Sequence, residues 1–473
     1  MAPHRLPTII ALLLALALTA AACGVEGDPE VAEEEPDDDP EEEPEDVDDE
    51  DEDDEPDEPE DEPDELAGEI TFSTLQLSPD FDDYIEGLIA EFEDEHPEVT
   101  VDWVDIPFEG AQERLLTDAA TGELADVVNL NPDFAFPLAV EGEFMDLEAE
   151  LDQELIDIYV EGAWDAFRYP NRDGAYAFPW YLSSEVTMFN ADIMEEAGLD
   201  PDDPPESFPE LFEQATQIAD ETEAYGWHPA LENRFIEDLV KEGVEVFDED
   251  ATEVNLTDPA AIAYVEELQD LYEAGAVSSD YVVEGHRAEI EAYQAGEVGL
   301  FTSGPQFLGI VEENAPEIAE ATGVGPQVVG ETGAIDMAVM GLMVPTDTEH
   351  PDEALAFAEF MTNAENQLAF FDEAQVFPSV EDALEDERIA DFETDDEREA
   401  DAIRILGEQI AEGEMLRPVA VDDEVNSALI ANAQEAVLGD ISAEEALENA
   451  EMEVQDILDR RDAGVPEDLE DDG

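Results

Sequence analysis

Strand-like and helix-like segments alternate along this chain from about residue 66 to about residue 460, and no other feature constrains its fold as much. The strand-like segments are apolar and β-branched or alternating, and they end in loops; they cover residues 69–75, 99–106, 127–130, 185–189, 298–301 and 338–344. Apolar residues recur at three- and four-residue steps over 84–95, 111–120, 209–219, 259–274, 351–361, 400–410 and 443–458. Strands that alternate with helices favour mostly parallel sheets with helices on both faces, so the pattern predicts an α/β fold.

The length of this region predicts two domains. About 400 of the 473 residues follow residue 66, which is more than one hydrophobic core usually serves. In sheets of this kind, ligands bind beyond the carboxyl ends of the strands. Binding residues are therefore expected on the loops that follow strands.

The N-terminus has the form of an export signal. Cys23, the only cysteine, follows an apolar run over 6–22, with His4 and Arg5 ahead of it, and this run is shorter than the roughly 20 residues that span a bilayer. Residues 21–24 (AACG) resemble a bacterial lipobox, although Ala20 stands where Leu is most usual. We expect a signal peptide over 1–22 and a lipidated Cys23 that anchors the chain to the outer face of the cytoplasmic membrane. An ordinary cleaved signal that leaves a free thiol is the alternative.

The chain is extremely acidic, with 137 Asp and Glu against 13 Lys and Arg, a formal net charge of −124, and Lys241 as its only lysine. Residues 23–66 are predicted to form a disordered acidic stalk, and 463–473 an acidic tail. The charge excludes nucleic-acid binding and indicates a halophilic protein, because concentrated salt screens self-repulsion. One cysteine gives no thiolate cage, and the stalk lacks the ligand spacing of a calcium loop, so we expect no metal and no cofactor.

The order of motifs after residue 68 resembles that of the bacterial extracellular solute-binding proteins of the sugar-binding family, which includes the maltose-binding protein. The matching segments, in chain order, are HPEVTV (96–101), NPD (131–133), DGAYAFP (173–179), MFNAD (188–192), PPESF (204–208), YQAGEVGL (293–300), SGP (303–305) and HPDEA (350–354).

This resemblance implies a two-lobed periplasmic-binding-protein-like fold with hinge crossings and an interlobe ligand cleft. The expected first lobe comprises 68–178 plus 330–385, and the second 179–329 plus 386–462. A monomeric receptor would capture a small-molecule ligand, a sugar by this resemblance, and closure of the lobes would present it to the permease subunits of an ABC importer.

The candidate ligand contacts fall on loops after strands and on positions that match cleft motifs of the family. Polar side chains would bond sugar hydroxyls, and aromatic rings would stack on the apolar faces of pyranose rings. The candidates are Gln76, Asn131, Asp133, Trp180, Tyr181, Ser183, Trp227, Ser303, Pro305, Gln306, Gly341 and Arg417. Trp103 and Trp164 are assigned to packing.

Several candidates have a structural alternative. Asn131 and Asp133 form either a polar clamp on the ligand or an Asx turn, since Asn-Pro-Asp is good turn chemistry. Trp227 is either a ligand aromatic or a packed ring, whereas Trp180 is interpreted as a cleft aromatic. Gln306 stands where the resembling motif has a stacking aromatic, so hydrogen bonding would replace stacking there.

Other functions remain as alternatives to sugar capture. Arg417 either binds an anionic ligand bidentately, as in a receptor for glycerol-3-phosphate-like esters, or neutralises Asp422 and Asp423. Polyamines and peptides are further alternatives within the same fold. An enzyme, such as a carbohydrate-active one, is not expected, because the five histidines form no metalloprotease motif and no nucleophile elbow is present. A third class of function, a stalked scaffold without a small ligand, is not expected either, because such a protein would not need the cleft-forming motifs.

Overall fold

The computed structural model describes residues 66–283, 286–394 and 396–462. The predicted signal peptide, Cys23, the stalk up to residue 65 and the acidic tail lie outside these residues. None of the helices in the described part is both long enough and apolar enough to cross a membrane.

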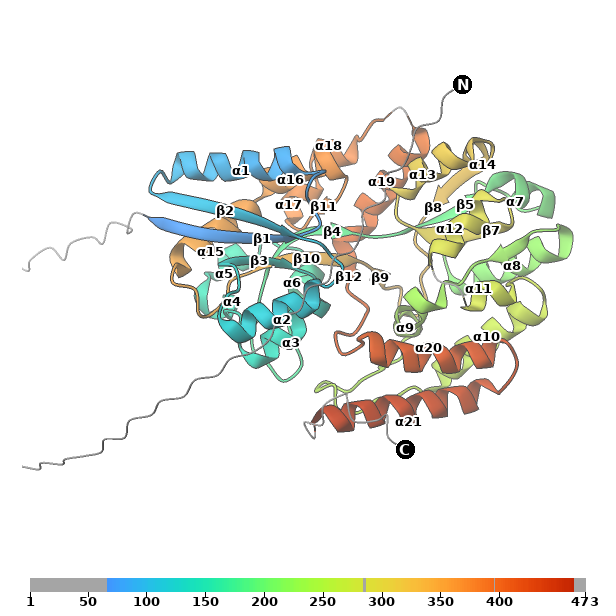
Figure 1. The fold of residues 1–473 in the computed structure, drawn as a ribbon. Helices are drawn as coiled ribbons and strands as arrows, with labels where there is room; N and C mark the ends of the chain where they lie inside the picture. The colour runs from blue at the N-terminus through green and yellow to red at the C-terminus, as the bar shows by residue number, and fades with distance from the viewer. Residues whose placement is uncertain (1–65, 284–285, 395, 463–473) are drawn as a thin grey trace, which may run out of the picture. The chain divides into compact units, whose positions relative to one another are not determined.

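A six-stranded sheet forms the centre of the first lobe (Figure 1). Its strands are β1 (Gly68–Leu75), β2 (Val99–Ile106), β3 (Val127–Leu130), β4 (Phe178–Ser183), β10 (Ala338–Met343) and β11 (Phe377–Pro378), in the order β11-β4-β10-β3-β1-β2. β1 runs parallel to β2 and β3, whereas β10 runs antiparallel to β3 and β4, and β11 antiparallel to β4.

A four-stranded sheet forms the second lobe. Its strands are β5 (Val186–Asn190), β6 (Tyr225–Trp227), β7 (Val298–Ser303) and β8 (Thr322–Gly325), in the order β6-β7-β5-β8. A short pair, β9 (Ile335–Asp336) and β12 (Gly413–Glu414), lies between the two sheets in Figure 1. The α/β fold with two lobes and hinge crossings is therefore confirmed, as are strands at all six predicted segments.

Two expectations from the sequence need correction. The sheets are not mostly parallel: β10, β11 and β5 each pair antiparallel with their neighbours. A crossover helix between two strands of the same sheet makes those strands parallel. The chain enters β10 from the second lobe, without such a helix, so β10 is free to run antiparallel to its neighbours. The predicted crossing after residue 178 lies inside β4, and the chain leaves the first sheet only after Ser183.

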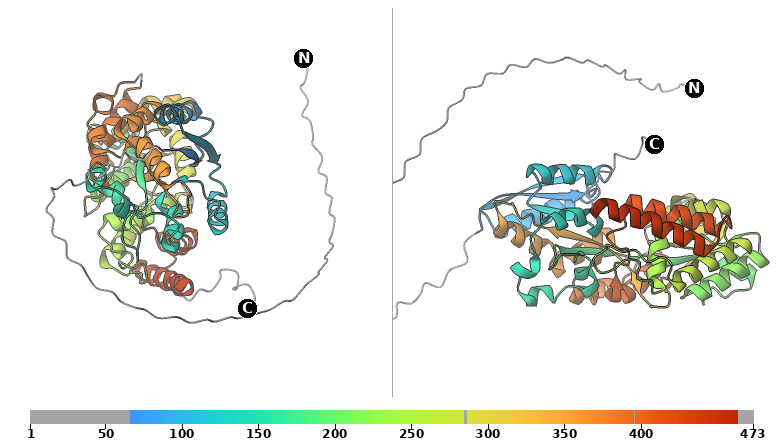
Figure 2. Two further views of the ribbon diagram at one scale, coloured as in Figure 1. Left: turned by 90° about the vertical axis from the view of Figure 1, so that its left-hand side faces the viewer. Right: turned by 90° about the horizontal axis from the view of Figure 1, so that it is seen from below.

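Helices cover the sheets. Those that precede β4 or lie between β10 and α19 are α1 (Asp82–Glu95), α2 (Ala111–Thr121), α3 (Pro132–Glu141), α4 (Leu147–Glu150), α5 (Gln153–Ile156), α6 (Glu161–Asp165), α15 (Pro351–Met361), α16 (Ala364–Ala374), α17 (Glu381–Leu384) and α18 (Glu387–Ala390). The others are α7 (Ala191–Ala197), α8 (Phe208–Glu221), α9 (Leu231–Lys241), α10 (Pro259–Glu273), α11 (Ser279–Val283), α12 (His286–Gln294), α13 (Phe307–Asn314), α14 (Pro316–Ala321), α19 (Glu397–Gln409), α20 (Asp423–Val437) and α21 (Ala443–Asp462), with a 3-10 turn η1 (Ile410–Glu412). The two C-terminal helices, α20 and α21, lie side by side in Figures 1 and 2 and pack on α10.

Helix α1 illustrates how apolar periodicity sets the packing. Its buried residues are Ile85, Leu88, Ile89 and Phe92, spaced by three or four residues or adjacent, so that they share one face of the helix. The Phe92 ring packs edge-on against Phe357 of α15, with ring centres 5.1 Å apart. Each buried side chain of this size contributes about 2 kcal/mol to folding, which fixes the helix on the sheet.

Candidate functional site

A cavity of about 430 Å³ lies where the chain crosses between the lobes. Its lining comes from three segments that are distant in sequence: residues 183–185 at the end of β4, Gly304, Gln306 and Phe307 after β7, and residues 336–338 from the end of β9 to the start of β10. Asn233 and Arg234 of α9 complete it. The structure thus brings together two candidates from the sequence, Ser183 and Gln306, both of which are exposed.

Asp336 is the carboxylate at the hinge. Its Oδ1 accepts a hydrogen bond of 3.0 Å from the backbone N–H of Leu416, and its own N–H donates to Gln327 Oε1 at 2.7 Å. Burial raises the pKa of Asp336 to about 7, and Glu237 adds to this effect while Lys241 opposes it. The β9–β12 pair is therefore held partly by a carboxyl group that titrates near neutral pH.

Arg234 of α9 bonds two carboxylates of the second lobe, those of Glu185 and Glu289. It donates from Nε to Glu185 Oε2 at 2.9 Å and from Nη2 to Glu185 Oε1 at 3.0 Å, which is a bidentate geometry. Its Nη1 donates to Glu289 Oε2 at 3.2 Å, and the Glu289 side chain is fully buried. These bonds fix a planar guanidinium beside the cavity.

A second polar group lies next to Asp336. Arg417, which follows β12, donates from Nη1 to Glu237 Oε1 of α9 at 2.9 Å. Asp133 of α3, in the first lobe, is close enough to Arg417 and Glu237 for their charges to affect its pKa. Burial raises the pKa of Asp133 to about 6; Arg417 opposes this rise and Glu237 adds to it. Burial also raises the pKa of Glu237, against the effect of Arg417.

Several buried oxygen atoms in this region have no hydrogen-bond partner among the described residues. They are Glu237 Oε2, Asp133 Oδ1, Asn131 Oδ1 and Ser303 Oγ. Asn131 is the N-cap residue of α3, yet its side chain accepts no capping bond, so the Asx-turn alternative does not account for it. Leaving a buried acceptor unpaired costs about 1–3 kcal/mol, and a ligand that donates hydrogen bonds would remove that cost.

The arrangement can bind a ligand that donates hydrogen bonds. In the described residues, no group of three or more His, Cys, Asp and Glu side chains is arranged to hold a metal ion. The carboxylates Asp133, Glu185, Glu237 and Asp336 outnumber the guanidinium groups of Arg234 and Arg417, and each guanidinium already bonds a carboxylate.

The structure places several aromatic candidates in the protein interior instead. The interpretation of Trp180 as a cleft aromatic needs correction: its ring is fully buried and stacks on Phe370 of α16, with centres 5.5 Å apart. Tyr181, partly buried, meets the same ring edge-on at 5.2 Å. Trp227 is buried against Phe212 of α8, 5.9 Å between ring centres, which selects the packing alternative.

The remaining candidates are backbone features or lie apart from the cavity. Gly341 is buried at an irregularity of β10, where an added Cβ would lie 2.5 Å from Phe167 Cζ, so packing explains it. Gln76 is exposed just after β1, in a left-handed conformation with φ of 52°. Pro305 is partly buried beside Gln306 at the start of α13.

The sequence did not single out Glu237, Asp336, Glu185, Arg234 or Glu289. Arg234 had a usable signal, because a cation is rare in this chain and the same reasoning selected Arg417. The carboxylates had none, since 137 acidic residues give no reason to choose these four.

Two α/β lobes, joined by several crossings and meeting at a polar cavity, define a solute-binding protein. The sequence profile of the family described as bacterial extracellular solute-binding protein matches residues 78–368, which is more than half of the chain. The chain belongs to this family.

Solved structures share its fold over nearly their full length. A periplasmic-binding protein from Synechococcus sp. MITs9220, provisionally assigned to oligosaccharides, is 30% identical with a TM-score of 0.74, covering 83% of this chain and 99% of that one. The GacH receptor of Streptomyces glaucescens, solved unliganded and with acarbose, is 23% identical with a TM-score of 0.64, covering 84% and 99%; it shows the fold alone.

Curated relatives match over shorter lengths. The sn-glycerol-3-phosphate-binding periplasmic protein UgpB of Brucella melitensis is 25% identical over 265 residues, 52% of this chain and 58% of the relative. A protein of Brucella abortus provisionally named as a binding protein is 25% identical over 278 residues, which are 57% of this chain and 65% of the relative. The chain thus spans less than two thirds of the length of these relatives.

Proposed function

We propose that this protein captures a carbohydrate between its lobes and delivers it to the permease of an ABC importer. The observation that carries the proposal is the set of buried acceptor oxygens without a partner in the described residues, on Glu237, Asp133, Asn131 and Ser303. Sugar hydroxyls donate hydrogen bonds, and carboxylate, amide and hydroxyl oxygens accept them. The protein from Synechococcus sp. MITs9220, provisionally assigned to oligosaccharides, supports the same ligand class.

A phosphate ester fits this site less well, even though UgpB is a relative. The predicted anion partner, Arg417, is already bonded to Glu237, with Asp133 nearby. A phosphate group would meet these carboxylates and that of Asp336 at short range in a partly buried site, where like charges repel strongly.

Titration calorimetry of a protein lacking the stalk, in molar salt, tests the proposal. The ligands would be a panel of mono- and oligosaccharides, polyols, glycerol-3-phosphate and polyamines. We expect saturable binding of at least one sugar, with no product formed on long incubation. Binding of a polyamine or phosphate ester without binding of any sugar would reject the carbohydrate assignment, and hydrolysis of a bound sugar would indicate an enzyme.

The family is extracellular, so the protein is exported. Beyond that, we propose that Cys23 is lipidated and that residues 23–66 form a tether, which lets a monomeric receptor reach its permease. The lipobox-like residues 21–24 and the apolar run before them support this proposal. Mass spectrometry of the mature N-terminus would test it: an unmodified Cys23, or cleavage elsewhere, would show a freely secreted receptor.

A further inference from the structure

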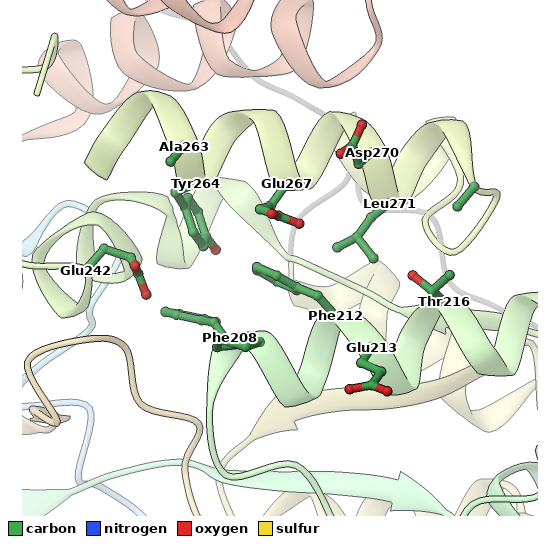
Figure 3. Close-up of a pocket in the computed structure, with 12 residues that line it drawn as sticks. Phe208, Phe212, Glu213, Thr216, Glu242, Ala263, Tyr264, Glu267, Asp270 and Leu271 are labelled. Carbon is green, nitrogen blue, oxygen red and sulfur yellow. The ribbon is translucent and has the colours of Figure 1, made fainter. Parts of the chain in front are cut away.

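A groove of about 670 Å³ lies between α8 and α10 in the second lobe (Figure 3). It shares no lining residue with the cavity at the hinge. Its volume falls within the range of about 300–1,000 Å³ that is typical of sites for small organic molecules.

Three aromatic rings form the inner wall of the groove. Phe208 and Phe212, one turn apart on α8, stack with their ring centres 5.7 Å apart and 17° between their planes. Tyr264 of α10 packs against Phe208 at 5.2 Å, and its hydroxyl donates to Asp238 Oδ2 at 2.6 Å, which fixes the ring. Figure 3 shows all three rings facing the space between the helices. Phe212 is only partly buried, so an apolar ring surface remains accessible.

Carboxylates surround these rings without a matching cation. Glu213, Glu242, Glu267 and Asp270 line the groove, and none of its lining residues is Lys or Arg. In Figure 3, Glu242 extends toward Phe208 at one end, and Glu267 reaches from α10 toward Phe212. Burial raises the pKa of Glu242, and the neighbouring Glu331 adds to the effect. A positive charge placed here would relieve that repulsion.

We propose that this groove is a second binding site, separate from the interlobe site, for a small amphipathic organic cation such as an aryl- or alkylammonium. The apolar body of such a ligand packs on Phe212, the ring that is only partly buried, and its charge lies between this ring and the carboxylates of Glu242 and Glu267. A ring face attracts a cation through its quadrupole, and the attraction persists in salt because the contact is desolvated. A neutral or anionic ligand of the same shape lacks these two interactions.

The experiment titrates the full chain with three probes of similar size: benzyltrimethylammonium, benzyl alcohol and benzoate. Calorimetry is run at moderate salt and in molar salt. We expect one cation to bind per chain, at least ten-fold more tightly than either other probe, and to remain bound when the interlobe site is saturated with sugar.

Variants locate the site. Glu267→Gln, Glu242→Gln and Phe212→Leu are each expected to weaken cation binding about five-fold, while circular dichroism confirms that each variant folds. Glu266→Gln is the matched control, because Glu266 is the exposed neighbour of Glu267 on α10 and does not line the groove. It should bind the cation as the unchanged protein does.

Four results would overturn the proposal. Equal binding of benzyl alcohol would show that charge is not recognised. An equal loss in Glu266→Gln and Glu267→Gln, or binding without saturation, would show diffuse attraction to an acidic surface. Displacement of the cation by sugar would place it in the interlobe site. Failure of either proposal leaves the other standing, since sugar binding is measured separately.

Discussion

Replacing Glu237 by Gln tests whether the Glu237–Arg417 pair excludes anionic ligands. Gln keeps the size of the side chain and its Oε1 acceptor, and removes one negative charge. The carboxylate accepts from Arg417 at 2.9 Å, and the Glu237 and Arg417 side chains are 9% and 24% exposed. When the acceptor of a charged hydrogen bond becomes neutral, the free energy of unfolding falls by about 1–2 kcal/mol. The loss stays below that for a fully buried ion pair, because Arg417 is partly solvated and keeps Asp133 as a second negative charge nearby.

The same change should alter ligand selection. Removing a unit charge about 5 Å from a bound phosphate changes its interaction energy by about 3 kcal/mol at an effective dielectric constant of 20, before screening by salt. We therefore expect glycerol-3-phosphate to bind at least ten-fold better to Glu237→Gln than to the unchanged protein. Sugar affinity should fall, because Glu237 Oε2, a buried acceptor without a partner in the described residues, becomes an amide donor.

The assay is titration calorimetry with a sugar and with glycerol-3-phosphate, together with urea unfolding. Glu232→Gln is the control, since Glu232 is an exposed carboxylate on the same helix. If Glu237→Gln leaves both affinities as they are in Glu232→Gln, the Arg417 pair does not govern selection and the argument against phosphate fails.

Two further predictions concern stability, and a third concerns the accessibility of a buried amine. Gly341→Ala should lower the free energy of unfolding by about 1–3 kcal/mol, measured in urea, because its Cβ would lie 2.5 Å from Phe167 Cζ. Asp336 has a folded-state pKa of about 7 against 3.8 for the free group, so the folded state holds the extra proton and stability should fall as pH rises from about 4 to 7. At about 1.4 kcal/mol per pKa unit, Asp336→Asn should be about 4 kcal/mol more stable than the unchanged protein at pH 8 and equally stable near pH 4, and a constant difference would refute this. Lys241, the only lysine, is 7% exposed, so acetic anhydride should modify its amine at least ten-fold more slowly in the native protein than in urea, as followed by mass spectrometry; equal rates would contradict its burial.

The fold was largely predictable because the periodicity of apolar residues is a local signal. Residues 69–75 and 99–106 alternate or cluster their apolar side chains in a way that only a strand accommodates well, and both are strands. Strand direction was not predictable in this way. A strand such as β10 has the same pattern whichever way it runs, and its direction depends on which lobe the chain comes from.

The candidate site was predictable only in part. Ser183 and Gln306 do line the hinge cavity. Asp133 and Arg417 belong to the polar group that also contains Glu237, and Asn131 lies two residues before Asp133. Trp180 was misassigned because a tryptophan on a strand has the same local sequence whether its ring faces a ligand or Phe370, which is 190 residues further along the chain.

The sequence by itself determined the acidic character, the alternation of strands and helices and the family, because each depends on composition or on residues close together in the chain. The tertiary structure decided which charged groups meet. Asp133, Glu237 and Arg417 are more than 100 residues apart from one another, and only the packing of two lobes around the hinge brings them together. Burial at that junction then sets their protonation and leaves acceptors open to a ligand, and no local pattern encodes burial of that kind.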